Sequence, residues 1–180
     1  MKKSKLAKLA LLALVAYLLP HSILAQDKKA EKLLSESSDA KAAFIKTDSS
    51  MAALFESSYG YVIFPKIGKG GFIVGGSGGD GILYEQGKSI GEVKTGQVTV
   101  GAQIGGQSYR EVIFFESQAA LDRMKESKTE FSSQISAVAV KSGVSKNAKY
   151  TDGVAVFTQD IGGLMAEATV GGQKFKYTAF

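Results

Sequence analysis

The residue that most resembles a catalytic nucleophile is a serine in a glycine-rich stretch. Ser77 is the central residue of GGSGG at 75–79, which is the spacing of the sharp turn that exposes the nucleophile of many serine hydrolases. Such a serine needs a histidine base. The single histidine is His21, and it lies in a segment that we interpret below as a signal peptide. The sequence therefore predicts that Ser77 lies in a turn and is not a nucleophile.

Two other patterns lack the context that their chemistry requires. GSGGDG at 76–81 fits a dinucleotide-binding fingerprint, but the strand-like ILY at 82–84 follows where a helix must bind the pyrophosphate. Ser38 with Lys41, and KTG at 94–96, resemble parts of the penicillin-binding serine enzymes. Their third element, SKN at 145–147, follows both instead of lying between them. We interpret the glycine-rich segment as a turn and these serines and lysines as surface residues.

The sequence also gives no support for a metal site or a cofactor. The chain has no cysteine, and its acidic residues are scattered without the spacing of a calcium loop. Without His21, no imidazole is left for acid–base catalysis near neutral pH. We therefore expect a protein that is not an enzyme and has no cofactor or metal. Hydrolysis by an unusual Ser–Lys pair ranks last among the alternatives.

The first 25 residues have the order of a secretory signal peptide. Four lysines precede an apolar run at 9–19, and a cleavage site is predicted after Ala25. The run is shorter than the roughly 20 residues of a membrane-spanning helix. We expect export, with the mature protein periplasmic or peripheral to the cell envelope. Residues 26–58 are then a helical segment that forms one structural unit with a β-rich domain at 59–180.

The charge of the mature chain does not favour binding to nucleic acid. Removing residues 1–25 takes four of the 22 basic residues and none of the 17 acidic ones, which leaves a net charge of +1. A nucleic-acid-binding protein should show a clustered basic excess. We expect no nucleic-acid partner.

The helical segment begins with an amphipathic pattern. From residue 28 to residue 46, Ala30, Leu33, Ala40 and Phe44 share one side of a 3.6-residue repeat. Leu34 and Ile45 join its edge. The polar side mixes lysines with acidic residues, so we expect this helix to pack on its own domain and not to insert into a membrane. Possible N-cap residues at 48–50 predict a second helix from Met51 to about Ser57.

After Tyr59 the period becomes alternating and glycine becomes frequent, which predicts short strands. Brief connections favour antiparallel pairing of neighbouring strands, and interior glycines would supply the bends of a curled sheet. A helix after Ser117, a possible N-cap, would turn Leu121 and Met124 toward the core. The fold class that we predict is α+β, with amino-terminal helices packed on a glycine-rich, mainly antiparallel β-sheet curled into a barrel or sandwich. The predicted strands are 61–64, 71–74, 81–84, 97–104, 109–115, 136–140, 154–158, 164–170 and 174–177.

Taken in order, several blocks of the chain resemble the SYLF domain family. YGYVIFP at 59–65 and GKGGF at 68–72 are similar to its opening signature, and the first of these looks like the bacterial branch. The resemblance covers nearly all of the mature chain. The further blocks are VGAQIGGQSY at 100–109, IFF at 113–115, SAVAV at 136–140, GVAVF at 153–157, GGLMAE at 162–167 and VGGQKFKY at 170–177.

The resemblance implies binding to membrane lipid, with phosphoinositides and actin as partners of fungal and animal members. For an exported protein of bacterial type, anionic bacterial lipid is the nearer ligand, bound through peripheral membrane contact. A phosphoinositide-like ligand is the alternative, and a protein partner is unknown. The family's basic contacts would correspond here to five lysines. They are Lys28, Lys29, Lys32, Lys66 and Lys69.

Two other functions fit parts of the pattern. Short alternating strands and a terminal Phe180 suggest a small structural barrel of the outer membrane, although few segments reach the roughly 10 residues of a membrane strand. If Tyr59, Tyr61 and Tyr109 were exposed, they would instead suit an envelope protein-interaction module, but we favour placing them in the core or at a strand edge.

Overall fold

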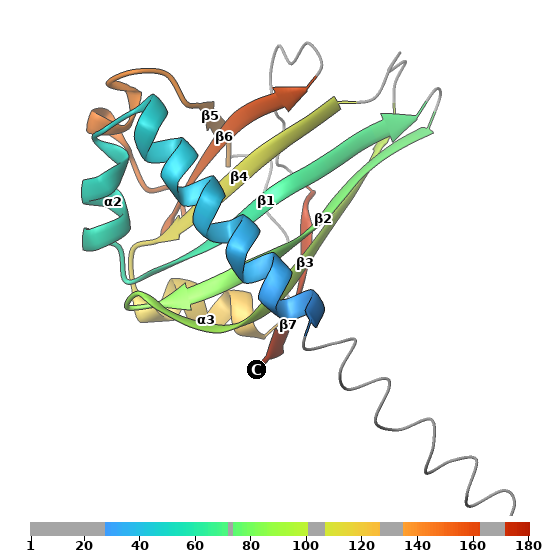
Figure 1. The fold of residues 1–180 in the computed structure, drawn as a ribbon, viewed down its shortest axis with the longest axis horizontal. Coiled ribbons are helices and arrows are strands. Elements are labelled where there is room, and N and C mark those ends of the chain that lie inside the picture. Colours follow the sequence, from blue (N-terminus) through green and yellow to red (C-terminus); the bar gives the residue numbers. More distant parts are fainter. Residues whose placement is uncertain (1–27, 72–73, 101–106, 127–134, 163–171) are drawn as a thin grey trace, which may run out of the picture.

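A seven-stranded sheet organises the part of the chain that the structure describes (Figure 1). The structure is a computed structural model that describes residues 28–71, 74–100, 107–126, 135–162 and 172–180. The strand order is β5-β6-β4-β1-β2-β3-β7, so the described strands form an open, curled sheet and do not close into a barrel. The predicted α+β class is confirmed. The strands are β1 (Gly60–Gly71), β2 (Val74–Glu85), β3 (Lys88–Val100), β4 (Gln107–Phe115), β5 (Ala137–Ala139), β6 (Val154–Gly162) and β7 (Lys174–Ala179).

Both faces of the central strands are buried because successive side chains point to opposite sides. Tyr61 and Ile63 of β1 pack under the amino-terminal helices, on a side that we call the amino-terminal face. Val62 and Phe64 pack with α3 (Gln118–Lys125) on the other side, the α3 face. Apolar alternation in the sequence therefore produces two cores, one on each side of the sheet.

The helix at residues 28–47 crosses the amino-terminal face diagonally (Figure 1). Leu33, Ala40 and Phe44 are buried as predicted, which confirms that this helix packs on its own domain. Ser37 is also fully buried on the same side, and its hydroxyl accepts a hydrogen bond of 3.1 Å from the Tyr84 hydroxyl. A polar residue in the buried stripe thus ties the helix to β2.

A buried carboxylate joins this helix to α2 (Met51–Ser57) and to the 3-10 helix η1 (Val144–Asn147). One oxygen of Asp48 accepts hydrogen bonds from the backbone NH and hydroxyl of Ser50, and the other accepts from the same two groups of Ser145. Burial alone would raise the pKa of Asp48, but these four bonds outweigh it and hold the pKa well below its usual range. The carboxylate is therefore an ionised anchor between segments far apart in sequence.

On the other face, α3 follows the prediction. The Ser117 hydroxyl caps it by accepting a hydrogen bond of 3.3 Å from the Ala120 NH, and Leu121 and Met124 are fully buried. No helix among the described residues is long and apolar enough to cross a membrane.

The prediction of a turn at 75–79 is wrong, because β2 runs straight through the glycines. The physical reason lies in β1. Around Pro65 and Lys66, the register of β1 shifts relative to both of its neighbouring strands, β2 and β4. Proline in a central strand requires such a bulge because it has no NH to donate. The bulge brings β1 close to β2, and a Cβ atom at Gly79 would lie 2.5 Å from the Lys66 carbonyl oxygen. Close approach, and not a bend, therefore explains glycine there.

Gly81→Ala is expected to lower the free energy of unfolding by about 3 kcal/mol. The new Cβ would lie 2.6 Å from the Ile63 carbonyl oxygen and 2.6 Å from the Phe64 ring, so β1 must move. Urea denaturation measures the effect. The matched control is Gly96→Ala, where the nearest atom is 4.0 Å away, and it should change stability by less than about 1 kcal/mol. Equal losses in the two variants would contradict the close-approach explanation.

Two more strand predictions need correction. β3 begins at Lys88, nine residues before the predicted start at Gln97, and β5 pairs with β6 in parallel although neighbouring strands were expected to be antiparallel. The connection that contains η1 is long enough for a parallel return. The predicted strand at 164–170 and the signal peptide lie outside the described residues.

Candidate functional site

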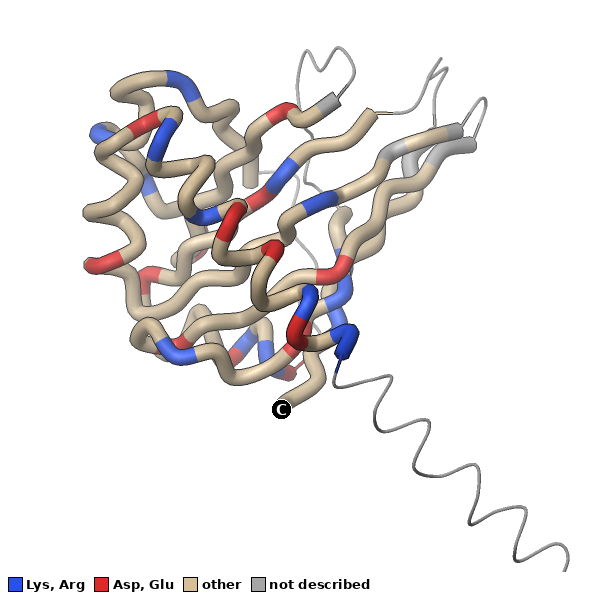
Figure 2. The backbone as a smooth tube through the Cα atoms, in the orientation of Figure 1, with Lys and Arg blue, Asp and Glu red and all other residues tan. Residues whose placement is uncertain are grey.

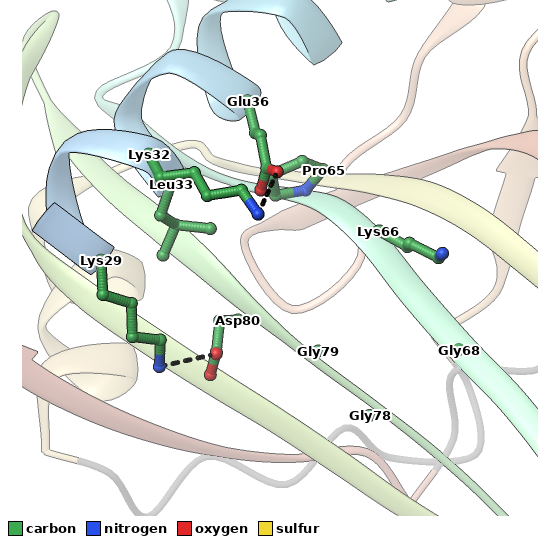
Figure 3. A pocket seen from close by; sticks show the side chains of 10 residues that line it. All are labelled: Lys29, Lys32, Leu33, Glu36, Pro65, Lys66, Gly68, Gly78, Gly79 and Asp80. Atoms are coloured by element: carbon green, nitrogen blue, oxygen red, sulfur yellow. Dashed lines mark ion pairs between the residues drawn. The ribbon is translucent and has the colours of Figure 1, made fainter.

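A groove on the amino-terminal face collects three of the five predicted lipid-binding lysines. It lies between the start of the helix at 28–47 and the bulge of β1, with a volume of about 390 Å³. Figure 3 shows Lys29 and Lys32 reaching from the helix, and Lys66 extending from β1. The groove is also lined by Leu33, Glu36, Pro65, Gly68, Gly78, Gly79 and Asp80.

The groove is open because the strands beneath it carry glycines, so that no side chains fill the space. Gly68 of β1 pairs with Gly78 of β2, and Gly78 pairs with Gly96 of β3, so a row of glycines crosses three strands. Gly68 has no heavy atom within 4 Å of an added Cβ. The bulge exposes Lys66 beside this row. The local sequence thus makes both the hollow and its basic rim.

Two of the lysines are already paired with acidic residues, as the dashed lines of Figure 3 show. The Lys29 amine lies 3.0 Å from a carboxylate oxygen of Asp80, and the Lys32 amine lies 3.7 Å from one of Glu36. The hydrogen bond from Lys29 to Asp80, together with their charge attraction, raises the pKa of Lys29 above its ordinary value. Lys66 makes no ion pair with any residue that the structure describes. Three lysines against two carboxylates leave the groove with a net charge of about +1.

The other two predicted lysines are placed differently. Lys28 is exposed at the start of the described helix but does not line the groove. The backbone of Lys69 pairs with Ser77 and Gln107, while its side chain lies outside the described part. Figure 2 shows basic and acidic residues interspersed over the fold. Sequence reasoning missed Glu36 and Asp80 as partners of the lysines, because only the fold brings Asp80 to Lys29.

A second polar cluster lies on the α3 face, on the other side of the sheet from the groove, where Glu111 of β4 pairs with Phe64 of β1. Glu111 of β4 is fully buried, and one of its oxygens accepts a hydrogen bond of 3.0 Å from the side-chain amide of Gln173. Burial raises the pKa of Glu111 to about 8, although the hydrogen bond from Gln173 opposes the rise. Glu111 is therefore mostly protonated at neutral pH.

Two of the three tyrosines suggested for protein contact are buried. Tyr61 and Tyr109 are each only 3% exposed and belong to the two cores. Tyr59 is half-buried, and its hydroxyl donates a hydrogen bond of 3.2 Å to Glu85. The favoured placement in the core is confirmed for Tyr61 and Tyr109, because strand alternation turns both rings inward, and the interaction-module alternative loses these two residues.

Comparison with known proteins relates part of the sequence to a family. Residues 96–177 match the Ysc84 family, described as "Las17-binding protein actin regulator". The chain is also 30% identical over 130 residues to a protein of Aeromonas veronii named beta cell expansion factor A. That alignment covers 68% of this chain and 47% of the relative, so the chain spans about half the relative's length. The family match runs from the end part of β3 to β7, whereas the groove lysines lie before it.

Proposed function

We propose that this chain, whose residues 96–177 match the Ysc84 (SYLF) family, is a non-enzymatic, lipid-binding protein of the cell envelope. It associates peripherally with anionic phospholipid after export, and the groove receives the headgroup. The placement of Lys29, Lys32 and Lys66 in the lining of one groove carries the proposal. Phosphoinositide-like headgroups are the alternative ligand. Actin is not proposed as a partner, because an exported bacterial-type protein would not meet it.

The energetics suit reversible binding. Each lysine close to an anionic surface contributes about 1 kcal/mol. The side chains of Lys29 and Asp80 are 53% and 34% exposed, and exposed ion pairs of this kind contribute only about 0–1 kcal/mol. A phosphate can therefore replace Asp80 as the partner of Lys29 at little cost. The bare floor at Gly68 and Gly78 lets a headgroup approach the sheet.

Vesicle co-sedimentation tests this function. The protein should pellet with vesicles of anionic phospholipid at low salt, remain in solution with neutral phosphatidylcholine vesicles, and dissociate as salt is raised. The variant Lys29→Gln/Lys32→Gln/Lys66→Gln should bind anionic vesicles about 100-fold more weakly.

The control for this variant removes the same charge elsewhere, through Lys88→Gln/Lys141→Gln/Lys146→Gln, where all three side chains are exposed. It should weaken binding by less than about 3-fold if the groove is the site. Gly68→Val supplies a second check, since it narrows the groove without changing charge. Equal recovery of the protein with neutral and anionic vesicles at low salt would contradict the proposal.

Removing an acidic partner should have the opposite effect. Asp80→Asn frees Lys29 and leaves the groove more positive, so affinity for anionic vesicles is expected to rise about 5-fold. Asp152→Asn, at an exposed turn, is the matched control and should change affinity by less than 2-fold, roughly the effect of a distant screened charge. Unchanged binding by Asp80→Asn would place the lipid contact elsewhere.

A further inference from the structure

A cavity of about 320 Å³ lies beside β5, the strand at one edge of the sheet (Figure 1). β5 is three residues long, and its pairing with β6 begins where Ala137 meets Val156. Val154 and Ala155, the two residues of β6 before that point, line the cavity, and so do residues 135 and 136 before β5. The cavity therefore lies where the parallel pairing of β5 with β6 stops.

The wall of this cavity is apolar and belongs to both cores of the protein. Val144 in η1 and Ala148 just after it are half-buried and add to the wall. The buried members of the lining are Ile135, Val154, Ala155, Val156 and Phe157. Water finds few hydrogen-bond partners against such a wall, so the wall favours an apolar ligand.

The exposed part of the lining has a different character. Val138 is 41% exposed, and the other exposed lining residues are polar, namely Ser136, Asn147, Lys149 and Thr151. Lys149 belongs to the segment 141–150, which carries three lysines and no acidic residue. Asp152 follows this segment but does not line the cavity. The solvent side of the cavity thus combines hydroxyl and amide groups with a positive charge, while its wall is apolar.

We propose that this cavity binds a medium-chain fatty acid, with the chain against the apolar wall and the carboxylate beside Lys149. A lysine amine forms strong, charge-assisted hydrogen bonds with a carboxylate, and the neighbouring hydroxyl and amide groups can donate others. A methylene group takes up nearly the roughly 30 Å³ of a water molecule, so the cavity holds a chain of about ten carbons. The two long acyl chains of a phospholipid exceed this volume, and the lining shares no residue with the groove.

NMR titration of the purified ¹⁵N-labelled protein at pH 7 tests the inference. The ligands are hexanoate, octanoate, decanoate and dodecanoate, with decylammonium as a chain of opposite charge. Decanoate should give saturable shifts of the Val138, Ala148 and Val156 amides, with a Kd on the order of 100 μM. Each added methylene should tighten binding about 3-fold up to about ten carbons, and by less than about 2-fold beyond, because the cavity is then full. Decylammonium should bind about 10-fold more weakly than decanoate, because it meets a lysine in place of an acid.

Two variants alter the lining at exposed positions, where a substitution should not disturb folding. Lys149→Gln should weaken decanoate binding about 5-fold through the lost charge pair. Val138→Ser should weaken it about 5-fold through lost apolar contact. The matched controls are Lys146→Gln, an exposed lysine of η1, and Val98→Ser, an exposed valine of β3. Neither residue lines the cavity, so each control should change the Kd by less than about 2-fold.

The cavity and the groove are tested independently. Lys66→Gln should leave the decanoate titration unchanged, just as Val138→Ser should leave vesicle binding unchanged, and circular dichroism checks that each variant is folded. Shifts that rise in a straight line up to 1 mM, roughly ten times the expected Kd, would overturn the inference. Equal affinities for decanoate and decylammonium would overturn it as well, because the site would then not recognise the carboxylate. An undiminished gain from decanoate to dodecanoate would show that the volume of this cavity does not limit binding, which is the third contradictory result.

Discussion

Glu111→Gln is expected to raise the free energy of unfolding at pH 8 by roughly 3–5 kcal/mol. In the folded protein the carboxyl group has a pKa of about 8, whereas an unfolded glutamate titrates near 4.3. Between these values the folded state keeps a proton that the unfolded state releases. Stability therefore falls as pH rises from about 4.3 to about 8 and is constant above that. Glutamine is uncharged and keeps an oxygen that can accept the bond from Gln173.

Urea denaturation at pH 5, 6.5 and 8 measures this effect. The wild type should lose stability across the series, while Glu111→Gln should remain nearly level. Glu116→Gln, an exposed position just after β4, is the matched control and should keep the wild-type pH dependence. A wild type that is equally stable at all three values would show that Glu111 is not held neutral by its surroundings.

The burial of Glu111 is a feature that could not be predicted from the sequence. Alternation over 109–115 predicted β4 and its apolar residues, because a side chain's face follows from its parity in a strand. The same parity places Glu111 on the face of Tyr109 and Ile113, but a charged residue at such a position does not by itself indicate full burial. That burial follows from the central position of β4 between β1 and β6, and from the curl that brings Gln173 across the sheet. Both are properties of the assembled sheet and not of a local segment.

The glycines of β2 are a second case in which the local sequence did not determine the structure. Glycine is common in turns and in close strand contacts, so GGSGG at 75–79 permitted both interpretations. The choice depended on the bulge at Pro65 in β1, a strand that is separate in sequence. Proline within an otherwise strand-like run was the available signal, since a central strand accepts proline only at a bulge.

Some of the residues that line the groove could be predicted from the sequence. Resemblance to the SYLF family pointed to Lys29, Lys32 and Lys66, and the fold brings these three together. Helical spacing alone could pair Lys32 with Glu36, four residues along the chain. The contact of Lys29 with Asp80 could not be found this way, because it depends on how the helix crosses β2.

Asp48→Ala is expected to lower the free energy of unfolding by about 3–5 kcal/mol at pH 7. It would leave the NH of Ser145, which is only 3% exposed, without its acceptor, whereas the Ser145 hydroxyl would keep the Ser50 hydroxyl 2.7 Å away. It would also release the link between the amino-terminal helices and η1. Asp39→Ala, at an exposed position of the same helix, is the control and should cost less than about 0.5 kcal/mol.

The pH dependence separates this anchor from Glu111, because the two carboxyl groups shift in opposite directions. The pKa of Asp48 is lowered in the folded state, so its contribution is fully present above the unfolded value of about 3.9 and is lost as pH falls through the folded value. Urea midpoints measured from about pH 4 to pH 2, below the range in which Glu111 changes stability, should therefore fall for the wild type. For Asp48→Asn they should start lower and fall less, since asparagine cannot ionise and offers an NH₂ group where Ser145 needs an acceptor. A wild-type acid transition reproduced unchanged in Asp48→Asn would mean that Asp48 is not the ionised anchor, and that its four hydrogen bonds contribute little to the union of the helices with η1.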